Sequence, residues 1–113
     1  MATVDVYERY YEAECEANGR MRHAALVKLV SDSEAGFIRY EAAVNFFPHD
    51  SEDDFAVSYD AYFSRPLYEA KGRRSKKREA VLLERLPAEI DALAEEAGGT
   101  VFWDRPLRDE RRG

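Results

Sequence analysis

Four segments of the chain alternate apolar and polar residues with a period near two, which is the pattern of half-buried β-strands. Turn-forming stretches separate them: Asn18-Gly19 after the first, SDSEAG after the second and PHDSEDD after the third. Strands joined by short breaks of this kind pair as antiparallel neighbours. The alternation therefore predicts a four-stranded antiparallel β-meander over residues 5–17, 20–30, 37–47 and 55–63.

The first segment is also rich in helix formers, and Asn-Gly can end a helix, so cross-strand chemistry has to decide its structure. A three-residue loop over residues 17–19 brings three acid–base pairs face to face: Glu16 with Arg20, Glu14 with Arg22, and Glu8 with Lys28. Such pairs stabilise a sheet, each by a few tenths of a kcal/mol. A two-residue loop would instead set acidic residues opposite apolar ones. We therefore expect a strand and the three-residue loop.

The opposite face of this meander is apolar and predicts the core. It includes Tyr7, Tyr11, Ala13, Cys15, Met21, His23, Ala25 and Leu29 from the first hairpin, Ile38, Tyr40, Ala42, Val44 and Phe46 from the third strand, and Phe55, Val57, Tyr59, Ala61 and Phe63 from the fourth. A face of this size needs a cover, because apolar surface is not left in water.

A C-terminal helix is the expected cover. Its apolar stripe repeats every three or four residues: Leu83, Leu86, Ile90, Leu93 and Ala97. Gly98-Gly99 ends the helix, and Pro87 predicts a kink or a split into two short helices. Residues 80–85 have an alternative reading as a fifth strand. After the glycines, TVFW predicts a short final strand, so the fold class is α+β, with one domain over residues 1–104 and a charged, mobile tail over 105–113.

Composition narrows the class of protein. The 113 residues are 45% hydrophobic and 12% aromatic, which is typical of a globular domain. One cysteine, no signal peptide and no long apolar run indicate a cytoplasmic protein without a membrane partner. Net charge is −6 at pH 7, which argues against general affinity for nucleic acids.

One stretch opposes this acidity. Residues 71–78, KGRRSKKR, hold six cations and no acid, while the rest of the chain has 11 Lys/Arg and 23 Asp/Glu. Cations in the first turn of a helix are unfavourable, so the cluster does not exist for stability. It predicts an anion or nucleic-acid contact through Lys71, Arg73, Arg74, Lys76, Lys77 and Arg78, or a contact with an acidic protein surface.

No other group of residues predicts a catalytic or metal site. The acidic loop of residues 49–54 lacks the glycine and distant glutamate of a calcium-binding loop, so it reads as a solvated turn. His23 is expected in the core and His49 in solvent, where a general-base role is its only functional reading. Cys15 is expected to be inert, because apolar and acidic surroundings raise a thiol pKa. No nucleotide-binding, hydrolase or zinc motif is present, and no cofactor is expected.

The outer face of the predicted sheet carries several large apolar residues: Leu26, Phe37, Phe47 and Tyr62. A face of this kind is typical of a protein–protein contact, with a different protein or with a second copy of the chain. The hypothesis is therefore a non-enzymatic, acidic protein-binding domain, such as an inhibitor, an immunity-type protein or a phage accessory protein. The alternative hypothesis is nucleic-acid or phosphate binding through residues 71–78.

Overall fold

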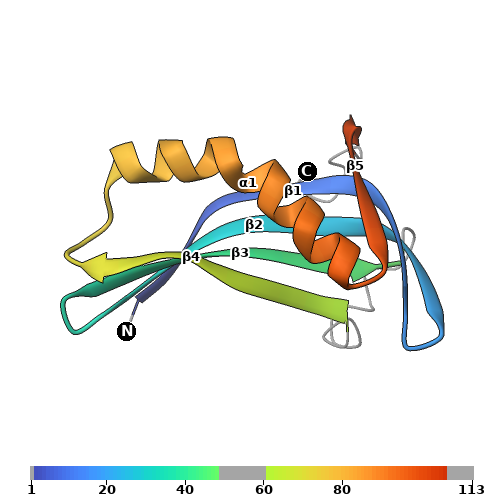
Figure 1. Ribbon diagram of the computed structural model, residues 1–113, viewed down its shortest axis with the longest axis horizontal. Helices are drawn as coiled ribbons and strands as arrows, with labels where there is room; N and C mark the ends of the chain where they lie inside the picture. Colours follow the sequence, from blue (N-terminus) through green and yellow to red (C-terminus); the bar gives the residue numbers. More distant parts are fainter. Residues whose placement is uncertain (1, 49–60, 107–113) are drawn as a thin grey trace, which may run out of the picture.

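Five antiparallel strands form one sheet, and a single helix packs across one of its faces (Figure 1). The computed structural model describes residues 2–48 and 61–106. In chain order the elements are β1 (Ala2–Ala17), β2 (Arg20–Glu34), β3 (Phe37–Phe47), β4 (Tyr62–Lys71), α1 (Lys76–Glu96) and β5 (Gly99–Pro106). The strands lie in the order β4-β3-β2-β1-β5, so β4 and β5 form the two edges. We call the face that packs against α1 the core face and the opposite one the outer face.

The α+β class and the antiparallel sheet are confirmed. The sheet has five strands rather than four, because β5 pairs antiparallel with β1 and becomes its outer neighbour. Strand β5 also runs to Pro106, past the boundary at residue 104 that the sequence suggested. Residues 107–113 of the expected tail lie outside the described residues.

The β1–β2 hairpin turns on two residues, not three. Asn18 and Gly19 both have positive φ, of 53° and 74°, which is the geometry of a type I′ turn. This turn matches the right-handed twist of paired strands, so Ala17 faces Arg20 directly. A β-bulge between Glu12 and Cys15 then shifts the register by one residue. The three-residue loop was wrong because the bulge, and not the loop, supplies the extra residue.

The bulge divides the predicted charge pairs. Beyond it Glu8 faces Lys28 as expected, and their charged groups lie 3.6 Å apart. Between the bulge and the turn, Cys15 faces Arg22, so Glu14 and Glu16 are not opposite Arg22 and Arg20.

The same register change places the side chain of Arg22 on the buried face of β2 and that of His23 on the exposed face. Arg22 is buried, and its guanidinium donates a 2.6 Å hydrogen bond to the carbonyl of Ala17. His23 and Met21, which were expected in the core, are exposed. Those two assignments were therefore wrong.

Strands β2 and β4 also differ from the predicted segments. β2 continues to Glu34, so only Ala35 and Gly36 turn the second hairpin. β4 begins at Tyr62 and continues to Lys71, whereas the alternation predicted a strand only as far as residue 63. Pro66 is tolerated because β4 is an edge strand and the register shifts beside it. Residues 55–60 of the expected fourth strand lie outside the described residues.

Helix α1 runs without interruption from Lys76 to Glu96, with Pro87 inside it. The predicted split at Pro87 and the alternative strand over residues 80–85 are therefore wrong, while a kink stays a prediction. Ser75 is the N-cap: its hydroxyl accepts a hydrogen bond from the backbone N–H of Arg78 at 3.3 Å. The helix lies across the core face as one continuous cover (Figure 1).

The core lies between α1 and the sheet. The third strand contributes the five residues that the alternation predicted, all buried: Ile38, Tyr40, Ala42, Val44 and Phe46. The helix contributes Leu82, Leu86, Ile90, Leu93 and Ala94, whereas Leu83 and Ala97 are only partly buried. Leu86, Ile90 and Leu93 are thus buried as predicted, whereas Leu82 and Ala94 take the core positions expected for Leu83 and Ala97.

The two leucines provide a test of this packing. Leu82→Ala should lower the free energy of unfolding by about 2–5 kcal/mol, because it opens a cavity in a fully buried site. Leu83→Ala removes the same atoms from a partly buried site and should cost clearly less. Chemical denaturation of both variants measures the difference. Equal losses would contradict the assignment of Leu82, rather than Leu83, to the core.

Candidate functional site

The basic segment, which we define as residues 71–78, joins the end of β4 to the first turn of α1. Its start is fixed to the sheet: the backbone N–H of Gly72 donates a 2.8 Å hydrogen bond to the carbonyl of Gly36 in the β2–β3 turn. Gly72 has a φ of 124°, a conformation open to glycine but strained for other residues. The segment then crosses over the end of the sheet to begin the helix.

Arg74 does not point freely into solvent. Its Nε donates to one carboxylate oxygen of Glu79 at 2.8 Å and a terminal nitrogen donates to the other at 3.2 Å. The hydroxyl of Tyr40 donates to Glu79 at 2.8 Å and accepts from the backbone N–H of Ser75 at 3.2 Å. Glu79 is 6% exposed, so this buried network attaches the start of α1 to β3, near the end of the sheet.

The proton equilibria of the network agree with its geometry. Hydrogen bonding to Arg74 holds the pKa of Glu79 below its ordinary value, against the opposing effect of burial. Hydrogen bonding to Glu79 raises the pKa of Arg74. Burial raises the pKa of the Tyr40 phenol, which therefore keeps its proton and donates it to the carboxylate. A bidentate, charge-assisted pair of this kind is stronger than a neutral hydrogen bond.

The other five predicted anion-binding residues are exposed. The guanidinium of Arg78 lies 4.3 Å from the ring centre of Tyr68, in a cation–π contact. Lys71, Arg73, Lys76 and Lys77 make no ion pair with any residue that the structure describes. Four cations of the segment are thus available to a partner, while Arg74 is engaged by Glu79.

The four predicted interface residues separate into two pairs. Phe37 and Tyr62 are exposed, by 50% and 43% respectively. Leu26 and Phe47 are buried at 6% each, in a small cluster with Ala24 against which Tyr10 packs. The expectation that Phe47 is exposed was therefore wrong. Phe37 faces Lys71 at one end of the β3–β4 pair and Tyr62 faces Asn45 at the other, so they do not form one patch.

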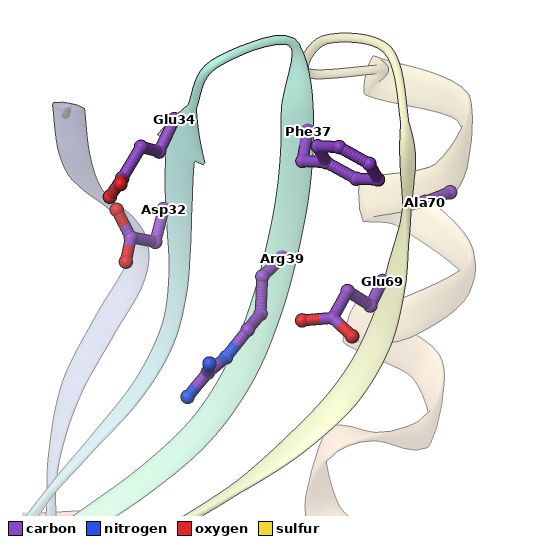
Figure 2. Close-up of a pocket in the computed structure, with 6 residues that line it drawn as sticks. All are labelled: Asp32, Glu34, Phe37, Arg39, Glu69 and Ala70. Carbon is purple, nitrogen blue, oxygen red and sulfur yellow. The ribbon is translucent and has the colours of Figure 1, made fainter.

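Phe37 belongs to a hollow of about 430 Å³ on the outer face (Figure 2). We call this concavity the hollow and define it by its lining: Asp32, Glu34, Phe37, Arg39, Glu69 and Ala70. It spans the ends of β2, β3 and β4, and α1 lies behind these strands on the other side of the sheet. Successive residues on one face of a sheet point the same way, which brings these charged side chains together.

The electrostatics of the hollow are dominated by carboxylates. Arg39 forms an ion pair with Glu41, beside the hollow. Within the described part of the chain, Glu34 and Glu69 make no ion pair. One carboxylate oxygen of Asp32, Oδ1, is buried without a hydrogen-bond partner among the described residues. Three carboxylates against one guanidinium leave the lining net negative, and Phe37 adds an exposed aromatic ring.

A second, smaller hollow lies beside the β1 bulge. It is lined by Glu12, Ala13, Glu14, His23, Phe102 and Arg105. Arg105 lies 4.1 Å from the ring centre of Phe102 and 3.7 Å from Glu12, so its charge is already engaged. Cys15 is buried nearby, and burial raises the pKa of its thiol, which disfavours a nucleophile.

Some predicted positions and classes of site are not represented. His49 and the acidic loop of residues 49–54 lie outside the described residues. Across residues 2–48 and 61–106, no group of His, Cys, Asp and Glu is arranged to hold a metal ion. The helix in that part of the chain is neither long nor apolar enough to cross a membrane.

Comparison with family models, curated proteins and solved structures finds no match to this chain. The residues themselves therefore carry the functional argument.

The hollow was missed by sequence reasoning although its signal was present. Asp32 and Glu34 continue the alternation of β2 through SDSE, a stretch that looks like a turn. Glu69 lies beyond residue 63, where the predicted fourth strand ended. Continuing both alternations would have placed Asp32, Glu34 and Glu69 on the outer face beside Phe37.

The Glu79 network gives a pH-dependent prediction. Because its folded pKa is depressed, Glu79 contributes stability that is complete above its unfolded pKa and is lost as the pH falls through the folded value. Glu79→Gln should lower the free energy of unfolding by about 1–3 kcal/mol at pH 7. The gap to the wild type should narrow as the pH falls below the ordinary glutamate value of 4.5.

Denaturation at a series of pH values measures this gap. Glu84→Gln, an exposed change on the same helix, is the control and should follow the wild-type curve at every pH. A gap for Glu79→Gln that stays constant from neutral to acid pH would contradict the role given to its charge.

Proposed function

We propose that the chain is a non-enzymatic protein-binding domain whose hollow on the outer face takes a basic segment of its partner. The observation that carries the proposal is the hollow itself: a concavity in which Glu34 and Glu69, without ion pairs to any described residue, lie around the half-exposed ring of Phe37. Of the two exposed aromatic residues expected at an interface, Phe37 is the one that lines it. Asp32 and Arg39 also line the hollow and contribute one negative and one positive charge to it.

The chemistry of the hollow favours a cationic partner. A lysine or arginine can lie over an aromatic ring while its charge meets nearby carboxylates. The acidity of the whole chain adds a long-range attraction, which raises the association rate of a basic partner. Exposed charge pairs are individually weak, so binding should be salt-sensitive and should depend on several contacts at once.

A labelled octalysine peptide is a suitable probe for this site. Glu34→Gln combined with Glu69→Gln should weaken its binding about fivefold at low salt, because two exposed charge contacts are lost. Phe37→Ala, which leaves the net charge unchanged, should weaken binding as well. Fluorescence anisotropy measures both effects.

The matched control is Glu84→Gln combined with Glu95→Gln, which removes the same charge from exposed helix positions. It should leave the affinity for octalysine nearly unchanged. If both pairs weaken binding equally, general acidity attracts the peptide and the hollow is not the site.

Nucleic-acid or phosphate binding is the second candidate function. It is favoured by the exposure of Lys71, Arg73, Lys76 and Lys77 without ion pairs to described residues. Lys76 and Lys77 also lie in the first turn of α1. The backbone N–H groups of a first helical turn point out of the helix and can bind an anion. Arg74 is excluded from this set, because Glu79 already neutralises it.

Four available cations set the expected salt dependence. Binding to duplex DNA should show a log–log slope of about −3.6 against salt concentration. Lys76→Gln should reduce the slope by about 0.9, whereas Arg9→Gln, an exposed change on β1, should leave it unaltered. Absence of binding at low salt would dispose of this candidate.

A further inference from the structure

We propose that two copies of the chain form a two-fold dimer in which the basic segment of each copy docks against the hollow of the other. This inference rests on the proposed function, because it names the partner of the same hollow. It is carried by one juxtaposition: the part of the basic segment that the Glu79 network holds and the carboxylates of the hollow lie at the same end of the sheet, on opposite faces.

The opposite placement follows from the strand register. Glu69 faces Arg39 on the outer face, where both line the hollow. Tyr40, the next residue of β3, points to the core face, and its hydroxyl accepts the backbone N–H of Ser75. The segment from Arg74 onward is therefore held over the core face by the Glu79 network. These residues therefore lie on the face of their own sheet opposite the hollow, the face on which α1 packs (Figure 2).

A two-fold axis can bring the basic segment of one copy to the hollow of another. If the axis lies in the plane of the sheet and across the strand ends, a second copy meets the first end to end with its faces exchanged. The basic segment of each copy then lies on the same side as the hollow of the other. Both contacts form at once and the assembly closes as a dimer, whereas a head-to-tail arrangement would continue into a filament.

The two surfaces are complementary in chemistry. The hollow offers Glu34 and Glu69 without ion pairs among the described residues, and the segment offers Arg73, Lys76 and Lys77. Phe37, which is half exposed, can lie against the aliphatic stem of an incoming lysine or arginine. Charge complementarity steers two like copies into this arrangement although each is negative overall.

The test uses sedimentation velocity of the full chain and two charge-reversed variants. The hollow variant carries Glu34→Lys and Glu69→Lys, and the segment variant carries Arg73→Glu and Lys77→Glu. All four positions are exposed, so both variants should fold, which circular dichroism checks. The wild type should dimerise at low salt, and raising the salt about tenfold should weaken the dimer at least tenfold.

Each variant alone should be monomeric, because its two reversed positions then meet charges of their own sign on the other copy. An equimolar mixture of the two should dimerise again, since both contacts regain opposite charges. Glu84→Lys with Glu95→Lys, the matched control on the helix, should dimerise like the wild type or more strongly, but should not restore association to either variant.

Three outcomes overturn the inference: a monomeric wild type, a dimer that both variants retain, or a mixture that fails to associate. The octalysine measurement separates these from failure of the proposed function. If the wild type is monomeric and still binds octalysine through Glu34 and Glu69, the hollow is a binding site and its partner is a different protein. If neither association nor peptide binding occurs, both proposals are wrong.

Discussion

The buried carboxylate of Glu79 is the interaction on which the arrangement of this molecule depends. It accepts hydrogen bonds from Arg74 and Tyr40, and Tyr40 in turn accepts the backbone N–H of Ser75. A buried carboxylate without such donors would be strongly destabilising. The hydrogen bonds that Glu79 accepts from Arg74 and Tyr40 therefore determine where α1 begins and place its first turn over β3. The rest of the helix then follows, because Leu82, Leu86 and Ile90 come onto the core face in phase with Glu79.

This anchor also separates the charges of the molecule. By binding Arg74 and holding Ser75 over Tyr40, it keeps the basic segment from Arg74 onward on the core side of the sheet end. The strand register places Glu34 and Glu69 on the outer side of the same end. Two groups of charges of opposite sign thus lie at the same end of the sheet, on opposite faces. Surfaces of this kind remain available to partners, and this is the physical basis of both functional proposals.

Much of the fold could be read from the sequence, because the residues that decide it act locally. Alternation predicted β3 at its observed limits and placed five of its residues in the core. The spacing of Leu86, Ile90 and Leu93 predicted the helix. The failures are equally specific. Asn18-Gly19 has the turn chemistry of a two-residue loop, but the charge pairs on either side favoured another register. Only the bulge between Glu12 and Cys15 reconciles the turn with the pair of Glu8 and Lys28.

The candidate site separates what the sequence determines from what depends on tertiary structure. The sequence by itself determined the strands and helix, the apolar core and the concentration of cations in residues 71–78, because periodicity and composition are properties of neighbouring residues. Tertiary structure alone decided that Arg74 is engaged by Glu79, that Phe47 is buried while Phe37 is exposed, and that Asp32, Glu34 and Glu69 share one hollow. Each of these three features depends on the pairing of segments that are distant in the chain. A register shift, such as the bulge in β1 or the irregularity beside Pro66, moves the following side chains from one face of the sheet to the other.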